Sequence, residues 1–247
     1  TSTATTDARP MPPDGGEVIA EGSRETGGLL RRHGWKLLLL FAGVLLPMWA
    51  FMELADEVHE AEAIPFDEPI LLFAQQVAHE GFDRVFLFFS EIGYAKGVVP
   101  VDIGLVLVLL ALRRWRDALF AALATDGSAL LNIGTKQLFA RDRPSLWDSI
   151  APEPTYSFPS GHAMGSMTLA LVLVLLAWPT RARWWVIAAM AVFVPMVGLS
   201  RVYLGVHYPS DILAGWAAAS IWVVGVYLLL YHPPRLGRFG GAGSTTP

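Results

Sequence analysis

Six long apolar runs divide the sequence, and most approach the length that crosses a lipid bilayer. They cover residues 35–54, 97–112, 118–139, 162–178, 184–199 and 212–230. A membrane-spanning helix needs about 20 mainly apolar residues, since each residue advances it by about 1.5 Å. The second run is short, although Asp102 is its single charged residue. The pattern predicts an all-α fold, an integral-membrane bundle of six transmembrane helices.

The segment between the first two runs follows a different pattern. Residues 56–91 are acidic, and polar residues interrupt the apolar ones too often for a helix that crosses hydrocarbon. Amphipathic helices that lie along a membrane surface suit such an alternation. We predict interfacial helices on the outer surface here, and a folded loop without membrane contact is the alternative.

The two ends of the sequence lack long apolar runs. The first 30 residues are polar and rich in Gly, Pro, Thr and Glu, without the basic start and apolar core of a cleavable signal peptide. Such a composition buries too little apolar surface to fold. We predict a disordered cytoplasmic tail at 1–30, a six-span domain at 31–232 and a flexible tail at 233–247.

Lysine and arginine residues orient the bundle. Six spans place both termini on one side, and that side receives ten of the 18 basic residues from the span ends and loops. Cytoplasmic loops carry the excess of Lys and Arg, so both termini are predicted to be cytoplasmic. Six basic residues remain on the outer side, and four of them lie in two short segments: Lys136, Arg141, Arg143 and Arg201. Basic residues on the outer side run against this preference for cytoplasmic Lys and Arg, which suggests that they have a function.

Composition narrows the class of protein. With 53% hydrophobic and 16% charged residues, the chain is too apolar for an ordinary soluble domain. The net charge of −4 and the scattered basic residues give no sign of a nucleic-acid partner. The absence of cysteine excludes disulfides, thiolate metal sites and cysteine nucleophiles. The predicted partners are the bilayer and a lipid, and the oligomeric state is left open.

Three polar segments fall at the predicted outer ends of the spans. They are KQLFARDRP at 136–144, PSGH at 159–162 and SRVYLGVHYPSD at 200–211. Two guanidinium groups can fork onto the oxygens of a tetrahedral anion, and a lysine adds a point charge. Ser160 and Gly161 open a predicted helix, whose first backbone N–H groups can face an anion. The segments together predict an anion site.

Two histidines accompany this site. Asp211 lies four residues after His207 and can fix its tautomer, which makes His207 a candidate nucleophile for a phosphohistidine. His162 is then the candidate acid and base for the leaving group and water. Each segment alone also fits a structural role: a helix cap, a lysine at a helix end, or a local hydrogen bond. Asn132, one helical turn before Lys136, is predicted to support that lysine.

The same residues resemble the signature of the type 2 phosphatidic acid phosphatase superfamily of integral-membrane lipid phosphatases. That signature reads K-x6-R-P, P-S-G-H and S-R-x5-H-x3-D, and this sequence fills every position. The resemblance implies a phosphatase that needs no metal or other cofactor and works through a phosphohistidine. It implies His207 as the nucleophile, Asp211 as its orienting carboxylate and His162 as the general acid. It assigns phosphate binding to Lys136, Arg143, Ser160, Gly161 and Arg201.

Substrate and alternatives follow from the predicted topology. A site at the outer membrane boundary of the cytoplasmic membrane suits a phosphate whose tail stays in the bilayer. The candidates are phosphatidic acid, phosphatidylglycerol phosphate and undecaprenyl diphosphate, and resemblance alone favours the last. The alternatives are a lipid phosphotransferase with the same intermediate and a non-catalytic lipid-binding or transport bundle. Vanadium haloperoxidases share the constellation, but they are soluble.

Overall fold

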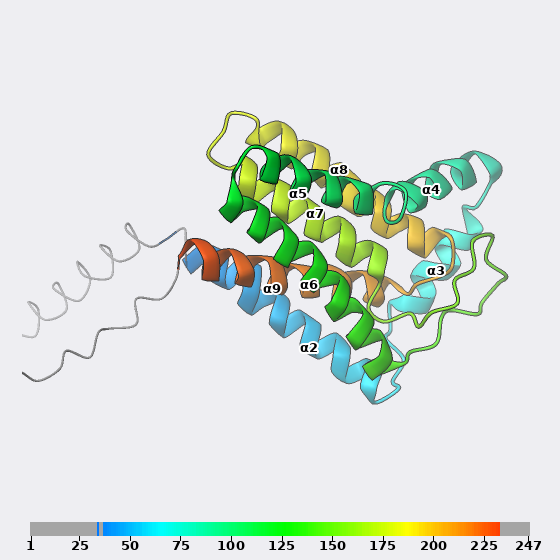
Figure 1. The fold of residues 1–247 in the computed structure, drawn as a ribbon. Coiled ribbons are helices and arrows are strands. Elements are labelled where there is room, and N and C mark those ends of the chain that lie inside the picture. The colour runs from blue at the N-terminus through cyan, green and yellow to red at the C-terminus, as the bar shows by residue number, and fades with distance from the viewer. Residues whose placement is uncertain (1–33, 35–36, 233–247) are drawn as a thin grey trace, which may run out of the picture.

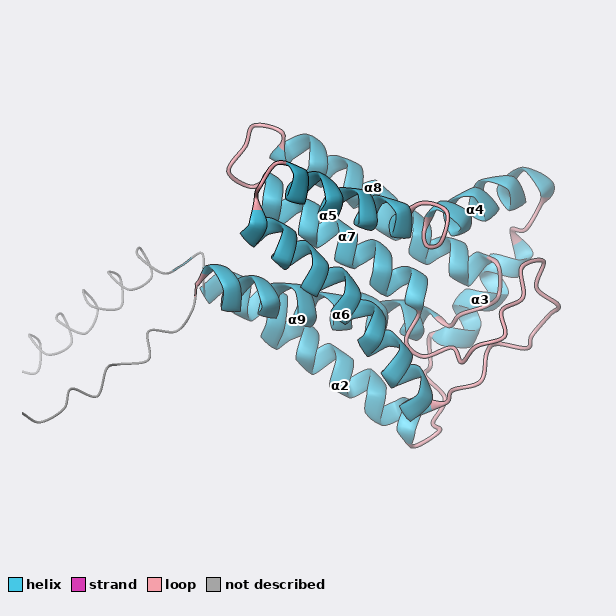
Figure 2. Ribbon diagram, in the orientation of Figure 1, coloured by secondary structure: helices cyan, strands magenta, loops and turns pink. Residues whose placement is uncertain are grey.

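The computed structural model describes residue 34 and residues 37–232, and within these ranges it is helical without any strand (Figure 2). A π-helical segment, η1 (Phe41–Leu45), leads into α2 (Leu46–His59). The elements that follow are α3 (Asp67–Gln76), α4 (Glu80–Ile92), α5 (Val98–Ala111), α6 (Trp115–Phe139), α7 (Gly161–Ala177), α8 (Arg183–Tyr203) and α9 (Pro209–Tyr231). The predicted tails at 1–30 and 233–247 lie outside the described residues.

The long helices α2 and α5–α9 pack side by side, and α7 contacts α6, α8 and α9 (Figure 1). The short helices α3 and α4 lie at one end of this bundle, together with the loop that joins α6 to α7. The α7–α8 connection lies at the opposite end, where α9 also finishes. The three polar segments of the sequence therefore gather at a single end of the bundle, as the predicted topology requires.

Among the residues that the structure describes, three helices are long and apolar enough to cross a membrane: Leu37–His59, Arg183–Tyr203 and Pro209–Tyr231. The apolar helices Val98–Ala111 and Gly161–Ala177 are shorter. α6 has 25 residues, about 37 Å of helix, but it carries Asp126 and Lys136. The structure therefore contains a helix for each predicted span, and the count of six membrane crossings stays a prediction.

Several boundaries differ from the apolar runs. α8 continues to Tyr203, so Ser200 and Arg201 belong to the helix rather than to a loop after residue 199. The helix that begins at Leu37 continues to His59, into the stretch predicted to start the interfacial segment. At the end of α8, Arg201 continues the helix because it donates to the Ser90 hydroxyl and the Glu153 carboxylate.

α3 and α4 occupy the predicted interfacial segment, and both pack on the bundle. Leu71 of α3 is fully buried and joins a cluster with Ala163, Val202 and Ile212. On α4, the Phe86 ring lies 4.3 Å from the Tyr203 ring of α8, centroid to centroid. These helices are thus part of the tertiary structure around the polar end. Their position at a membrane surface stays a prediction.

Close backbone approach fixes how α9 meets the start of α7. A Cβ at Gly215 would lie 2.8 Å from the carbonyl oxygen of Ser160, so only glycine lets the two segments approach this closely. Gly205 turns the chain after α8 with φ of +68°, a left-handed conformation that favours glycine. This turn returns the chain toward the bundle two residues before His207.

Candidate active site

Lys136 and Arg143 meet over one stretch of the loop between α6 and α7. Lys136 lies in the last turn of α6, and its ammonium donates to the Thr155 hydroxyl at 3.3 Å and to the Tyr156 carbonyl. Arg143 donates to the same two groups, at 3.0 Å to Thr155 Oγ1 and at 3.3 Å to the Tyr156 carbonyl. Ala140 ends α6 in a left-handed conformation (φ 45°), which turns the chain toward Arg143.

The PSGH segment forms the N-terminus of α7. The Ser160 hydroxyl caps the helix by accepting from the Ala163 N–H at 3.4 Å. The Ser160 N–H, predicted to face an anion, instead donates to the Asp211 carbonyl at 3.0 Å. Asn132 donates to the Pro159 carbonyl at 3.1 Å, so it fixes this turn rather than acting on Lys136. Gly161 leaves room for Asn132, because a Cβ there would lie 3.0 Å from the amide oxygen.

His207 is fully buried between a carboxylate and a guanidinium. Its Nδ1 lies 3.3 Å from Asp211 Oδ2, and its Nε2 lies 3.1 Å from Arg143 Nη1. A guanidinium can only donate, so Nε2 accepts and the ring proton lies on Nδ1, facing Asp211. The neutral imidazole therefore keeps a lone pair on Nε2, on the side of the cations.

The charge around His207 supports this neutral form. Burial, and then the positive charges of Arg143, Arg201 and Lys136, hold the pKa of His207 well below its usual 6.5. The Glu153 carboxylate acts in the opposite direction, but more weakly. His207 is thus unprotonated at neutral pH, as a nitrogen nucleophile must be.

Glu153 lies among the three cations of this region, although it was not among the residues predicted from the sequence. Its Oε2 accepts from Arg143 Nη2 at 2.7 Å, and its Oε1 accepts from Arg201, which is 1% exposed. The same Oε1 lies 3.7 Å from Nδ1 of His162. Burial raises the pKa of Glu153, but the positive charges of Arg201, Arg143 and Lys136 outweigh burial and hold this pKa below its usual value. No periodicity or motif distinguishes this glutamate from the other loop carboxylates.

These contacts define two adjoining groups of residues. We call the first the anion site: Lys136, Glu153, Arg143, His162, Arg201 and His207. The second, the rear cluster, lies behind Asp211 as seen from His207 and consists of Asp67, Arg141, Tyr208, Ser210 and Asp211. The structure thus brings all eight predicted site residues into one region, with Ser160 and Gly161 at the α7 terminus beside Asp211. It adds Glu153, Arg141 and Asp67.

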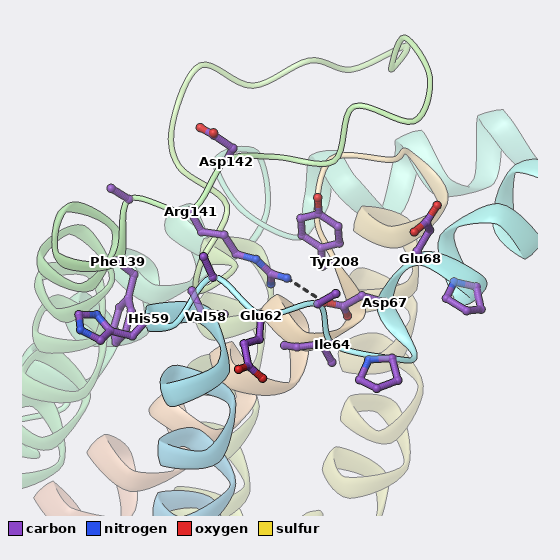
Figure 3. Close-up of a pocket in the computed structure, with 15 residues that line it drawn as sticks. Val58, His59, Glu62, Ile64, Asp67, Glu68, Phe139, Arg141, Asp142 and Tyr208 are labelled. Carbon is purple, nitrogen blue, oxygen red and sulfur yellow. Dashed lines mark hydrogen bonds and ion pairs between the residues drawn. The ribbon is translucent and has the colours of Figure 1, made fainter.

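Arg141 joins the two carboxylates of the rear cluster. It donates to Asp211 Oδ1 at 2.7 Å and to Asp67 Oδ2 at 2.9 Å, and its guanidinium lies 4.1 Å from the centre of the Tyr208 ring. Figure 3 shows Arg141 directed at Asp67 in the wall of a pocket of about 770 Å³, whose rim includes Glu62 and Glu68. A sequence signal for Arg141 existed, because it was one of the outer cations. None existed for Asp67.

A second pocket of about 580 Å³ opens on the anion site and is lined by Lys136, Arg143 and Glu153, with Thr155 and Tyr156. It offers space beside the cations for more than a phosphate group. Within the described residues, no group of three or more His, Asp or Glu side chains is placed to hold a metal ion. The cationic lining suits an anionic ligand.

Comparison with known proteins identifies relatives of this arrangement. Residues 117–234 match the family model described as the PAP2 superfamily, and this range contains every predicted site residue. Phosphatidylglycerophosphatase B of Bacillus subtilis (strain 168) is 27% identical over 194 residues, 76% of this chain and 94% of that protein. The undecaprenyl-diphosphatase of Sulfolobus acidocaldarius is 32% identical over 143 residues, 56% of this chain and 65% of that protein.

A solved structure shares the fold. The crystal structure described as the first transmembrane PAP2 type phosphatidylglycerolphosphate phosphatase, from Bacillus subtilis, matches with a TM-score of 0.68 at 24% identity. The match covers 79% of this chain and 98% of that chain. The relatives are phosphatases of lipid phosphates by their names, and the helical bundle agrees with a membrane protein.

Proposed function

Because residues 117–234 belong to the PAP2 superfamily, we propose that this protein is a membrane lipid phosphatase. It hydrolyses a phosphomonoester or diphosphate of a lipid through a phosphohistidine on His207. The observation that carries the proposal is the placement of His207, whose Nδ1 faces Asp211 at 3.3 Å and whose Nε2 faces Arg143 at 3.1 Å. One ring nitrogen is held by a carboxylate, and the other is presented to a cluster of cations.

Phosphate binding begins when the phosphate displaces the Glu153 carboxylate from its arginine partners. Its two oxygens accept from Arg143 and Arg201, the groups assigned to phosphate. A phosphate dianion offers more charge and more acceptor oxygens than a carboxylate, so it competes for both guanidinium groups. Once Arg143 turns to the phosphate oxygens, His207 Nε2 is released to approach phosphorus.

In the first chemical step the His207 Nε2 lone pair forms the bond to phosphorus while the bond to the leaving oxygen breaks. His162 donates its proton to that oxygen, and Asp211 stabilises the charge that develops on the His207 ring. The negative charge of the bound phosphate favours the protonated form of His162 that this step requires. In the second step His162 accepts a proton from water, water oxygen bonds to phosphorus, and the P–N bond breaks.

The substrate class follows from the setting and from the relatives. A lipid phosphate can present its head to a polar helix end while its tail stays in the bilayer. The names of the relatives support phosphatidylglycerol phosphate and undecaprenyl diphosphate as candidate substrates, and phosphatidic acid is a third candidate. The site faces the outer side of the cytoplasmic membrane, with both termini inside.

The test is phosphate release by protein purified in detergent, measured on these three lipids in excess chelator. We expect release by the parent and a loss of at least about 10³-fold in His207→Ala, because the nucleophile is removed. The matched control is His59→Ala, since His59 is exposed and lies outside the anion site.

A radiolabelled phosphate should be trapped on the parent as an acid-labile, base-stable phosphoryl group. Parental turnover by His207→Ala would contradict the mechanism, and transfer of phosphate to added glycerol would indicate a phosphotransferase.

A further inference from the structure

Asp67 begins α3 but bonds to the start of α9. Its carboxylate is in a residue only 4% exposed, and Oδ1 accepts from the Ser210 N–H at 2.8 Å while Oδ2 accepts from the Ser210 hydroxyl at 2.5 Å. The first N–H groups of a helix have no partner within the helix. Asp67 therefore caps α9 from a position 143 residues earlier in the chain. It also lies outside the range that matches the PAP2 superfamily.

Arg141 completes the link from Asp67 to the site. One of its terminal nitrogens, Nη2, donates to Asp67, while Nη1 donates to Asp211 Oδ1 at 2.7 Å and to the Ser210 hydroxyl at 2.8 Å. The side chain is 15% exposed. The guanidinium fork is rigid and planar, so binding to Asp67 fixes the direction in which Arg141 approaches Asp211.

Each oxygen of Asp211 then has its own partners. Oδ1 accepts from Arg141, whereas Oδ2 accepts from the Tyr208 N–H at 2.9 Å and faces His207 Nδ1 at 3.3 Å. Rotation of this fully buried carboxylate would break bonds on both oxygens. The orientation of the His207 ring is consequently set by a chain of contacts that ends on α3.

We propose that Arg141 and Asp67 are positioning residues for the reaction, which hold the Asp211 carboxylate so that His207 Nε2 stays directed at the phosphate. The inference rests on the proposed function, because it assigns a role relative to the nucleophile. Both residues act through Asp211. A mutation in either should therefore lower kcat while leaving KM nearly unchanged, since the phosphate-binding cations are retained.

The two residues also carry opposite charges next to Asp211, which gives a test of sign. Arg141 opposes protonation of His207 by its positive charge, and Asp67 favours it by its negative charge. The other charged or titratable groups that face His207 are Arg143 and Glu153 from the loop, Lys136 from α6, His162 from α7, Arg201 from α8 and Asp211 from α9. None of these groups is itself substituted in variants of Arg141 and Asp67, so the single variants differ in charge only at Arg141 or Asp67.

The experiment compares Arg141→Gln, Asp67→Asn and the double variant with the parent in kinetics on a lipid phosphate. We expect kcat to fall about 10- to 100-fold in each single variant, the loss typical of removing an outer partner that orients a functional histidine. The acid limb of kcat/KM should move to higher pH in Arg141→Gln and to lower pH in Asp67→Asn. Each shift is on the order of one pH unit. The double variant should return the limb toward that of the parent.

The control is Lys96→Gln, which removes an outer cation from an exposed ion pair with Glu91 and should leave kcat and the pH profile unchanged. A purely structural link between α3 and α9 would lower thermal stability without shifting the limb in opposite directions. If the two folded single variants have the same acid limb of kcat/KM as each other, the inference is overturned. If Arg141→Gln does not fold, the shift between Asp67→Asn and the double variant carries the same test of sign.

The inference and the proposed function can fail separately. A parent that releases no phosphate contradicts the proposed function. The titration of the His207 ring, followed by NMR in detergent, then measures the effect of Arg141 and Asp67 without turnover. Release by the parent with normal kcat in both folded single variants contradicts only the inference.

Discussion

Arg141 and Arg143 lie two residues apart in the loop after α6, yet their guanidinium groups belong to different clusters. Arg141 binds Asp67 and Asp211 in the rear cluster, and both carboxylates are buried. Arg143 binds Glu153 and His207 in the anion site. The same type of side chain thus pairs with two buried carboxylates in one cluster and with one carboxylate and a histidine in the other.

The difference lies in the balance of charge around each arginine. In the rear cluster, one cation faces the two carboxylates Asp67 and Asp211, so no positive charge is left for a ligand. In the anion site, three cations, Lys136, Arg143 and Arg201, surround the single carboxylate Glu153. The surplus of positive charge suits an external dianion, whereas hydrogen bonds alone do not separate the two clusters.

The largest expected effect comes from Arg201, the most buried cation of the anion site. Arg201→Gln should lower kcat/KM by about 10²- to 10³-fold, because it removes a preorganised charge from the developing phosphorane. The assay is phosphate release from a lipid phosphate. The control, Arg183→Gln, changes an arginine at the other end of α8 and should leave kcat/KM unchanged. If folded Arg201→Gln keeps a near-parental kcat/KM, Arg201 does not stabilise the phosphate in the reaction.

The second prediction compares the two arginines of the loop directly. Inhibition by inorganic phosphate should weaken about 10-fold or more in Arg143→Gln, since a charge-assisted pair with the anion is lost. In Arg141→Gln it should change by less than about threefold, because the rear cluster supplies no free positive charge. The measurement is the inhibition constant at fixed pH and salt. Equal weakening in both variants would show that the two clusters do not act separately.

A third prediction concerns pH and Glu153. The lowered pKa of His207 places the acid limb of kcat/KM below pH 6.5, because the nucleophile stays neutral until the pH falls that far. The Glu153 carboxylate raises the pKa of His207. Glu153→Gln should therefore move the limb to still lower pH and tighten phosphate inhibition about 3- to 10-fold, as the internal competitor loses its charge. A limb displaced upward would contradict this assignment.

The smallest effect is expected at the opposite end of the bundle. Arg114 and Asp117 form an i,i+3 ion pair with a distance of 2.6 Å, and the Arg114 side chain is half exposed. Exposed pairs of this kind contribute less than about 1 kcal/mol to stability. Arg114→Gln should leave kcat, KM and phosphate inhibition at parental values, and thermal unfolding in detergent should shift only slightly. A loss of turnover there would mean that charge at both ends of the bundle matters.

Local patterns in the sequence predicted much of the fold. Apolar runs marked the helices, since a helix that packs or crosses lipid must present apolar side chains along most of its length. The runs missed helix ends such as that of α8, where Arg201 continues the helix because Glu153 and Ser90 receive its donors. The spacing of His207 and Asp211 was likewise readable, because four residues at the start of a helix bring the two side chains together.

Contacts between distant segments could not be predicted from the sequence in the same way. Glu153 resembles any loop carboxylate until the fold brings it between Arg143 and Arg201. Asp67 was part of an acidic stretch assigned to a surface helix, and its burial depends on how α3 docks through Leu71. Pairing across such distances is decided by packing and by the cost of burying an unpaired charge.

Residue types, their order and their local spacing are properties of the amino-acid sequence alone. These fixed the helices, the cations of the loop and the predicted pairing of His207 with Asp211, because each depends on neighbours within a turn or two. Which arginine faces which carboxylate depends instead on how the helices pack. Buried charges must find partners wherever the packed helices bring them. In this bundle that requirement separates Arg141 at the back of Asp211 from Arg143 in front of His207.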